Sequence, residues 1–156
     1  SLKNKIKNII ILIMLLVAII VGCTQVDNNT AKPETEQQIE NIVIEETGKY
    51  TTTEDVALYI HTYNKLPSNF ITKKEATKLG WESDEGNLWK VTEQKSIGGD
   101  MFGNREGKLP SKDGRKWYEC DVNYEGGFRE AERIVYSNDG LIYYTEDHYK
   151  TFIRIY

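Results

Sequence analysis

The stretch AERIVYSNDGLIYYT, residues 131–145, decides the fold class of this chain. Two short runs rich in β-branched and aromatic residues flank an Asn-Asp-Gly turn at residues 138–140. An Asp-Gly pair between two such runs is a strong hairpin signal, because the tight turn needs residues that tolerate a positive φ. The stretch therefore predicts two antiparallel strands, residues 131–137 and 141–145.

The same strand pattern continues on both sides of this hairpin. Residues 116–122 and 152–155 are also short, aromatic and β-branched. Breakers containing glycine precede and follow the earlier run, at residues 112–114 and 125–127. Strand character begins near Ser96, so the second half of the domain is predicted to be an antiparallel meander.

Helical signals precede the strands, and the longest of them begins at Thr52. An acidic residue follows this threonine three positions later, which is typical of a helix N-cap. An apolar stripe then recurs at helical spacing until Pro67 forbids continuation. The residues of the stripe are Val56, Ala57, Tyr59, Ile60 and Tyr63.

Two shorter helices are expected after Pro67. Thr72 and Glu75 form a capping box, and that helix ends at Gly80, since glycine suits the left-handed position after a helix. A further helical turn is expected at residues 88–91. Helices followed by a meander of strands indicate an α+β domain, whose antiparallel sheet packs one face on the helices.

The N-terminal segment is typical of an exported protein. Lysines precede an apolar run at residues 9–21, which is shorter than the roughly 20 residues that span a bilayer, so residues 1–22 are expected to be a signal peptide. Cys23 follows as in a lipobox, and we expect it to be lipidated; an ordinary cleaved signal is the alternative. Residues 23–49 otherwise form a polar spacer, apart from the apolar triplet at 42–44, which can dock on the domain.

Composition limits the function classes. The formal net charge is −4, from 20 Lys and Arg against 24 Asp and Glu. Proteins that bind nucleic acids are usually basic, so a nucleic-acid substrate would require a local cationic cluster. With Cys23 lipidated, Cys120 is left without a partner, and a domain of about 105 residues must be stabilised by its core alone.

One strand places several polar side chains together. Alternate side chains of a strand share a face, so Trp117, Glu119 and Asp121 lie on one face of residues 116–122. Arg133 lies on the next strand. A solvated face with exposed ion pairs is one interpretation of this pattern, and a functional cluster is the other.

The two histidines are far apart in the sequence. His148 lies in the loop between the last two strands, and His61 lies on the first helix, where a surface role is expected. Two distant histidines and two distant cysteines do not have the spacing of metal ligands. We therefore expect neither a metal nor another cofactor.

Several long motifs of this chain resemble those of one protein family. They are Tyr63-Asn64-Lys65-Leu66-Pro67, Ile71-Thr72-Lys73, Leu79-Gly80-Trp81, Lys95-Ser96-Ile97-Gly98-Gly99-Asp100, Asn104-Arg105-Glu106-Gly107-Lys108-Leu109-Pro110 and Asp147-His148-Tyr149. Residues 50–156 are, on these motifs, similar to the barnase family of microbial guanyl-preferring ribonucleases. The resemblance implies three N-terminal helices packed on a five-stranded antiparallel sheet.

The resemblance also implies a catalytic set. Glu119 matches the general base that takes the proton of the ribose 2′-OH, and His148 matches the general acid that protonates the departing 5′-oxygen. Lys73, Arg129 and Arg133 match cations that stabilise charge on the phosphate. Because the nucleophile belongs to the RNA, the implied reaction needs no metal: transesterification to a 2′,3′-cyclic phosphate, then hydrolysis.

A guanine site is implied in the same way. The substrate-binding residues that the resemblance implies are Phe102, Asn104, Arg105, Glu106 and Tyr149. The Glu106 carboxylate would accept hydrogen bonds from the base, as is usual in the recognition of an unpaired base. Two acids, Asp121 and Asp100, are implied to support the cations. Gly103 stands where the family has a serine, so the strength of the guanine preference stays open.

Three functions compete on this sequence. An exported endoribonuclease acting on single-stranded RNA is the leading hypothesis, because the acid–base pair and the cations are all retained. A non-catalytic RNA- or protein-binding relative and a structural surface lipoprotein are the alternatives. We expect a monomer on the extracellular face of the cell membrane, anchored through lipid on Cys23, or else secreted. The resemblance further implies an acidic barstar-like inhibitor as a partner.

Overall fold

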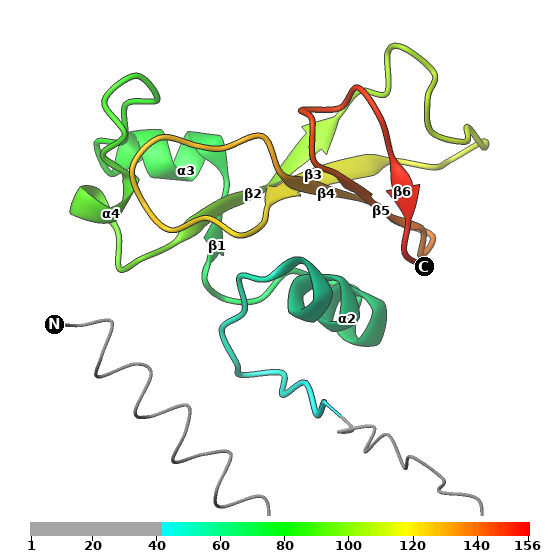
Figure 1. Ribbon diagram of the computed structural model, residues 1–156, viewed down its shortest axis with the longest axis horizontal. Helices are drawn as coiled ribbons and strands as arrows, with labels where there is room; N and C mark the ends of the chain where they lie inside the picture. The colour runs from blue at the N-terminus through cyan, green and yellow to red at the C-terminus, as the bar shows by residue number, and fades with distance from the viewer. Residues whose placement is uncertain (1–41) are drawn as a thin grey trace, which may run out of the picture. The chain divides into compact units, whose positions relative to one another are not determined.

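The computed structural model describes residues 42–156, which contain three helices and six strands (Figure 1). In chain order these are α2 (Thr53–Tyr63), β1 (Phe70–Ile71), α3 (Lys73–Lys78), α4 (Leu88–Val91), β2 (Ser96–Phe102), β3 (Trp117–Asp121), β4 (Arg133–Ser137), β5 (Ile142–Thr145) and β6 (Ile153–Arg154). The expected signal peptide, Cys23 and the spacer up to residue 41 lie outside the described residues. None of the helices in residues 42–156 is long and apolar enough to cross a bilayer.

Helix α2 begins and ends where its local chemistry predicts. The Thr52 hydroxyl accepts a hydrogen bond from the Asp55 N–H at 3.2 Å, and acidic residues in the first turn favour the positive end of the helix dipole. At the other end Asn64 takes a left-handed conformation, with φ 55°, and its N–H donates to the Ile60 carbonyl at 2.8 Å. The buried stripe consists of Val56, Ala57, Tyr59 and Ile60.

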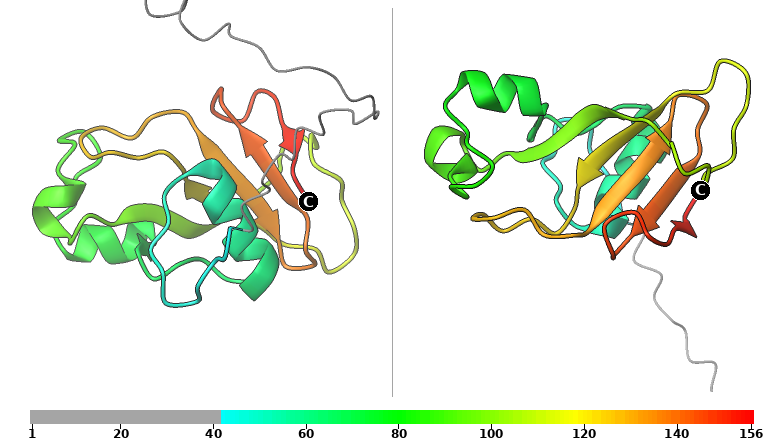
Figure 2. Two further views of the ribbon diagram at one scale, coloured as in Figure 1. Left: turned by 60° about the horizontal axis from the view of Figure 1, so that its bottom comes forward. Right: turned by 90° about the horizontal axis from the view of Figure 1, so that it is seen from above.

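Helices α3 and α4 lie at one end of the sheet (Figures 1 and 2). The predicted capping box is present at the start of α3, where Thr72 and Glu75 each accept the other's backbone N–H. Helix α4 spans the four residues predicted for it. Together with β1 and β2, these helices enclose a separate apolar cluster of Ile71, Ala76, Trp81, Leu88, Ile97 and Tyr124.

The expectation of three helices packed on the sheet is therefore only partly correct. Helix α2 contacts β4 and β5, so it covers one face of the sheet, whereas α3 chiefly contacts β2. The six residues of α3 and the four of α4 are too short to span that face, since a helix rises about 1.5 Å per residue. These two helices instead form the second, smaller core.

The sheet itself is mixed and six-stranded, and not five-stranded and purely antiparallel as expected. Its strands follow the sequence order from β1 to β6. β1 pairs in parallel with β2, with Phe70 opposite Ser96 and Ile71 opposite Ile97, and every other pair is antiparallel. The connection between β1 and β2 passes through α3 and α4, and such a crossover brings the next strand back in the same direction.

The predicted hairpin joins β4 to β5. The Ser137 N–H donates to the Leu141 carbonyl at 2.8 Å, and Gly140 has a φ of 98° that only glycine adopts readily. Val135 of β4 lies opposite Tyr143 of β5. This register keeps the alternation of the two strands in phase, so their faces continue those of β3.

The two faces of the sheet bury different side chains. One face packs on α2 through an apolar cluster that includes Cys120, Val122, Ile134 and Ile142. The other face carries Trp117, Glu119 and Asp121, as the alternation predicted, and loops with aromatic side chains cover part of it. Glu119 is only 6% exposed and Asp121 1% exposed, so the interpretation as a solvated face with exposed ion pairs is wrong.

Residues 44–50 form a strap across α2. Ile44 is buried, although the two residues before it are exposed. The Tyr63 hydroxyl donates to the Ile44 carbonyl at 2.8 Å, and the Tyr59 hydroxyl donates to the Glu46 carbonyl at 2.7 Å. The last part of the segment expected as a spacer is thus in contact with the domain.

Candidate active site

Glu119 is the buried carboxylate at the centre of the site. Its two oxygens accept hydrogen bonds from the Lys73 ammonium and from the Tyr149 hydroxyl. Glu119 lies on β3, Lys73 is the first residue of α3, and Tyr149 lies on the loop between β5 and β6. Three segments that are distant in the sequence therefore meet at one carboxylate.

Opposing effects set the pKa of Glu119. Burial acts to raise the pKa, but the hydrogen bonds from Lys73 and Tyr149 and the charges of Lys73 and Arg129 outweigh burial and lower it. Glu119 is therefore ionised near neutral pH, as a general base must be. Burial, together with the contact to Glu119, raises the pKa of Tyr149, so the phenol remains a hydrogen-bond donor.

A second buried carboxylate, Asp121, holds two arginines beside Glu119. Arg129 donates two hydrogen bonds to the Asp121 carboxylate, from Nε to Oδ2 at 2.7 Å and from Nη2 to Oδ1 at 2.7 Å. Arg133 Nε lies 2.9 Å from Asp121 Oδ1, which is close enough for an ion pair but lacks the angle of a hydrogen bond. Its Nη1 donates to the Glu132 carbonyl at 2.7 Å. The bidentate contact fixes the Arg129 plane, and one carboxylate against two guanidinium groups leaves a net positive charge.

Asp100 fixes the position of Lys73. Asp100 lies on β2 opposite Glu119 of β3, after an irregularity in the register at Gly98. Its carboxylate accepts the backbone N–H of Lys73 at 2.9 Å. This hydrogen bond attaches the first turn of α3 to the sheet. The backbone of Lys73 is therefore held in place where its side chain reaches Glu119.

His148 lies on a loop with an unusual backbone. His148 and Tyr149 are consecutive non-glycine residues with φ values of 56° and 70°, in the left-handed region. The Tyr149 N–H donates to the Thr145 hydroxyl at 3.0 Å. The His148 imidazole is exposed, and its ring centre lies 4.7 Å from that of Tyr149. Because Tyr149 also contacts Glu119, the Tyr149 ring separates the His148 imidazole from the buried Glu119 carboxylate.

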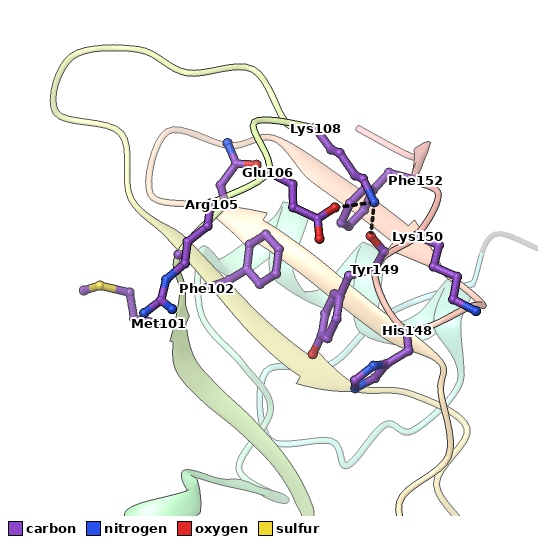
Figure 3. Close-up of a pocket in the computed structure, with 11 residues that line it drawn as sticks. Met101, Phe102, Arg105, Glu106, Lys108, His148, Tyr149, Lys150 and Phe152 are labelled. Atoms are coloured by element: carbon purple, nitrogen blue, oxygen red, sulfur yellow. Dashed lines mark hydrogen bonds and ion pairs between the residues drawn. The ribbon is translucent and has the colours of Figure 1, made fainter.

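A pocket of about 590 Å³ opens beside this cluster (Figure 3). Its volume is within the range of small-ligand sites. Phe102 and Tyr149 pack together with ring centres 5.1 Å apart, and the Phe152 ring lies 6.2 Å from that of Phe102. The lining residues are Met101, Phe102, Gly103, Asn104, Arg105, Glu106, Lys108, His148, Tyr149, Lys150 and Phe152.

The side chain of Asn104 shapes one wall of the pocket. Asn104 has a φ of 42°, its amide nitrogen donates to the Leu109 carbonyl at 2.8 Å, and its amide oxygen accepts the Leu109 N–H at 3.1 Å. Both polar atoms of this side chain thus close the loop that follows β2. In this arrangement Asn104 holds the loop, while Arg105 and Glu106 are exposed at the pocket.

Lys108 links the two walls of the pocket. Figure 3 shows its ammonium between the Glu106 carboxylate, 2.6 Å away, and the Tyr149 carbonyl, 3.1 Å away. The sequence reasoning did not single out Lys108 as a site residue. Its place in the Asn104–Pro110 motif was the only available signal, because the distance along the chain from Lys108 to Tyr149 conceals the contact.

The structure brings most of the expected residues together in two adjoining groups. Around the carboxylates lie Lys73, Asp100, Glu119, Asp121, Arg129, Arg133 and Tyr149. Around the pocket lie Phe102, Asn104, Arg105, Glu106, His148 and Tyr149. Tyr149 belongs to both groups. His61 belongs to neither, since its ring stacks on Tyr156 at 4.0 Å. Cys23 lies outside the described residues.

The chemistry of the site is that of an acid–base pair with cations. It offers an ionised carboxylate, an exposed imidazole and three positively charged side chains within one surface region. Such groups transfer protons and stabilise negative charge on a bound anion. Within residues 42–156, no three His, Cys, Asp or Glu side chains are grouped so that they could hold a metal ion.

Comparisons with known proteins agree with this class of site. The family model described as ribonuclease matches residues 53–156. A ribonuclease of Heyndrickxia coagulans is 58% identical over 104 residues, which are 67% of this chain and 95% of that protein. Ribonucleases of Bacillus intermedius and Bacillus pumilus are also 58% identical over 104 residues, and the match spans 64% of their length. The chain belongs to the ribonuclease family, and the resemblance to microbial ribonucleases seen in its motifs is confirmed.

Proposed function

We propose that this domain is an endoribonuclease that cleaves single-stranded RNA after guanosine, without a metal, through a 2′,3′-cyclic phosphate. The observation that carries the proposal is Glu119. It is an ionised, buried carboxylate that contacts Lys73 and Tyr149, lies next to the arginines held by Asp121, and is one ring away from His148. The ribonuclease relatives supply the substrate class.

The first step of the proposed reaction breaks the RNA chain. Glu119 takes the proton of the ribose 2′-OH, the 2′-oxygen attacks phosphorus, and the bond from phosphorus to the 5′-oxygen breaks. His148 gives its proton to that departing oxygen. Lys73 and the two arginines stabilise the charge that builds on the phosphate oxygens, and their contacts to fixed carboxylates keep them oriented before the substrate arrives.

The second step returns both groups to their starting states. Water attacks the cyclic phosphate while His148, now neutral, accepts the water proton. Glu119, now protonated, gives its proton to the 2′-oxygen as the bond from phosphorus to that oxygen breaks. The products are a guanosine 3′-phosphate end and a free 5′-OH end, and neither residue is consumed.

The pocket beside the carboxylates is the proposed guanine site. An unpaired base is normally read by stacking and by contacts to its Watson–Crick edge. Phe102 supplies an aromatic wall, and the Glu106 carboxylate is at the pocket rim, where it can accept from N1–H and N2–H₂ of guanine. Adenine has no donors at these positions, which supports a preference for guanine.

Mapping of cleavage products tests this proposal. A structured RNA digested in excess chelator is expected to yield fragments ending in guanosine 2′,3′-cyclic phosphate at early times, and 3′-phosphate later. A DNA of the same sequence is expected to stay intact, since it lacks the 2′-OH nucleophile. Loss of all activity on chelation, or cleavage of DNA, would contradict the mechanism.

We also propose where the enzyme acts and what accompanies it. The basic segment, the short apolar run and Cys23 support export, with lipid on Cys23 as the anchor. Two acyl chains hold a protein firmly on a membrane, whereas one holds it only marginally. We propose a monomer on the outer face of the membrane, with an acidic barstar-like inhibitor that protects the producing cell.

Fractionation of producing cells tests the location. The wild-type enzyme is expected in the membrane fraction, and a Cys23→Ser variant is expected in the medium or retained as an uncleaved precursor. Mass spectrometry of the wild-type N-terminus should find lipid on Cys23. A wild-type enzyme that is found entirely in the medium, with an unmodified N-terminus, would refute the anchor and leave the ribonuclease proposal untouched.

A further inference from the structure

The loop that carries His148 is closed by a single carboxylate, that of Asp147. Its Oδ1 accepts from the Thr145 hydroxyl at 2.9 Å, from the Lys150 N–H at 3.0 Å and from the Thr151 N–H at 2.9 Å. Its Oδ2 accepts from the Thr151 hydroxyl at 2.6 Å. Four donors from both ends of the loop thus converge on one side chain.

This convergence also shows in the ionisation of Asp147. The hydrogen bonds from Thr151, followed by those from Thr145 and the Lys150 N–H, hold the pKa of Asp147 well below its usual range. The carboxylate is therefore charged near neutral pH. It acts as a fixed acceptor and not as a proton carrier.

The two residues enclosed by these hydrogen bonds have an energetically unfavourable backbone conformation. His148 and Tyr149 both have positive φ, a conformation that non-glycine residues keep only where surrounding contacts impose it. Tyr149 has three hydrogen bonds of its own: its N–H donates to Thr145, its hydroxyl donates to Glu119, and its carbonyl accepts from Lys108. For the exposed His148, the closure of the loop by Asp147 is the constraint.

We propose that Asp147 is the positioning residue for His148. Its carboxylate closes residues 145–151 around the left-handed pair and so fixes where the imidazole stands beside the pocket. This inference rests on the proposed function, because it takes His148 as the general acid. It adds a residue that contacts neither the RNA nor the reacting atoms but determines how well the acid is placed.

Two substitutions at Asp147 separate loop closure from charge. Asp147→Ala removes all four acceptor contacts, and we expect kcat on a guanylyl dinucleotide to fall about 10²-fold, since small misplacements of a reacting group have effects of that size. KM should change less than kcat, because the Asn104 loop on the opposite wall of the pocket is closed by its own hydrogen bonds to Leu109. Asp147→Asn should restore most of the turnover, because its amide oxygen can accept the same three bonds as Oδ1.

Asp139 provides the matched control. It is also a loop carboxylate with a strongly lowered pKa, held by Arg115 at 2.9 Å and by the Ser137 hydroxyl at 2.6 Å, but it lies in the β4–β5 turn away from the pocket. Asp139→Ala is expected to lower the Tm without lowering kcat. All assays are run where circular dichroism shows each variant to be folded. Equal losses of kcat in the two alanine variants would overturn the proposal.

A double-mutant cycle gives the decisive result. If Asp147 acts through His148, the loss caused by Asp147→Ala should shrink from about 10²-fold to a few-fold in a His148→Gln background. An undiminished loss in that background, or no loss in the wild-type background, would overturn the inference alone. Native turnover of His148→Gln by itself would instead overturn the acid role of His148, and with it the proposed mechanism.

Discussion

At the scale of single residues, the ionisation of Glu119 depends on its contact with Lys73. The surroundings of Glu119 lower its pKa overall. Its carboxylate can therefore act as a base above this lowered pKa, and it becomes protonated as the pH falls through it. Lys73→Met should raise that pKa and move the acid limb of the kcat/KM profile to higher pH. Lys74→Met, at an exposed position on the same helix, should leave the limb in place. Profiles that coincide for wild type and Lys73→Met would show that the coupling is absent.

The same coupling contributes to stability with a definite sign. A carboxyl with a lowered pKa in the folded state stabilises the fold above its unfolded pKa, and this contribution disappears as the pH falls through the folded value. Asp139, whose pKa is lowered to about 2 by Arg115 and Ser137, has the same sign. Falling pH is therefore expected to weaken both the hairpin turn and the active site.

Individual site residues could be predicted from the sequence to very different degrees. Strand alternation placed Glu119 and Asp121 on one face, but burial, which separates an active site from a solvated face, depends on loops distant in the sequence. The contact between Lys73 and Glu119 joins residues 46 positions apart and has no local signal. For these positions the family motifs carried the information that periodicity lacked.

At the scale of elements, the strap of residues 44–50 is expected to stabilise α2. Tyr63→Phe removes the hydroxyl that donates to the Ile44 carbonyl, so the free energy of unfolding should fall by about 1 kcal/mol. Tyr118→Phe is the control, since within residues 42–156 the Tyr118 hydroxyl makes no hydrogen bond. Urea denaturation measures both, and kcat should not change. Equal stability of the two variants would mean that the strap contributes nothing.

Elements with local signals were predicted well, and those without were not. Caps at Thr52 and Thr72 and the turn at Gly140 act within a few residues, so they can be recognised in the sequence. β1 has only two residues, which are too few for a periodic pattern. It also pairs in parallel with β2, a strand that comes after α3 and α4 in the chain. The short lengths of α3 and α4 were visible, but their separate core depends on Trp81 and Tyr124 meeting across the fold.

At the scale of the whole molecule, charge predicts a modest dependence on salt. Residues 50–156 carry 15 Lys and Arg against 18 Asp and Glu, so long-range attraction of RNA is weak. The cations of the site are few, and ion pairs with Glu119 and Asp121 partly neutralise them. With about three phosphate contacts, the slope of log kcat/KM against log salt should be about −2 on single-stranded RNA. A slope of about −4 or steeper would reveal a basic surface that this account does not contain.

The turnover of acid and base variants on a guanylyl dinucleotide tests the central claim most directly. Wild type, Glu119→Gln, His148→Gln and the double variant are compared under single-turnover conditions, each verified as folded. Each single substitution is expected to lower the rate of cyclic phosphate formation about 10²- to 10⁴-fold, the usual scale of general acid–base catalysis. Near-native rates in both single variants would contradict the assignment of Glu119 as base and His148 as acid.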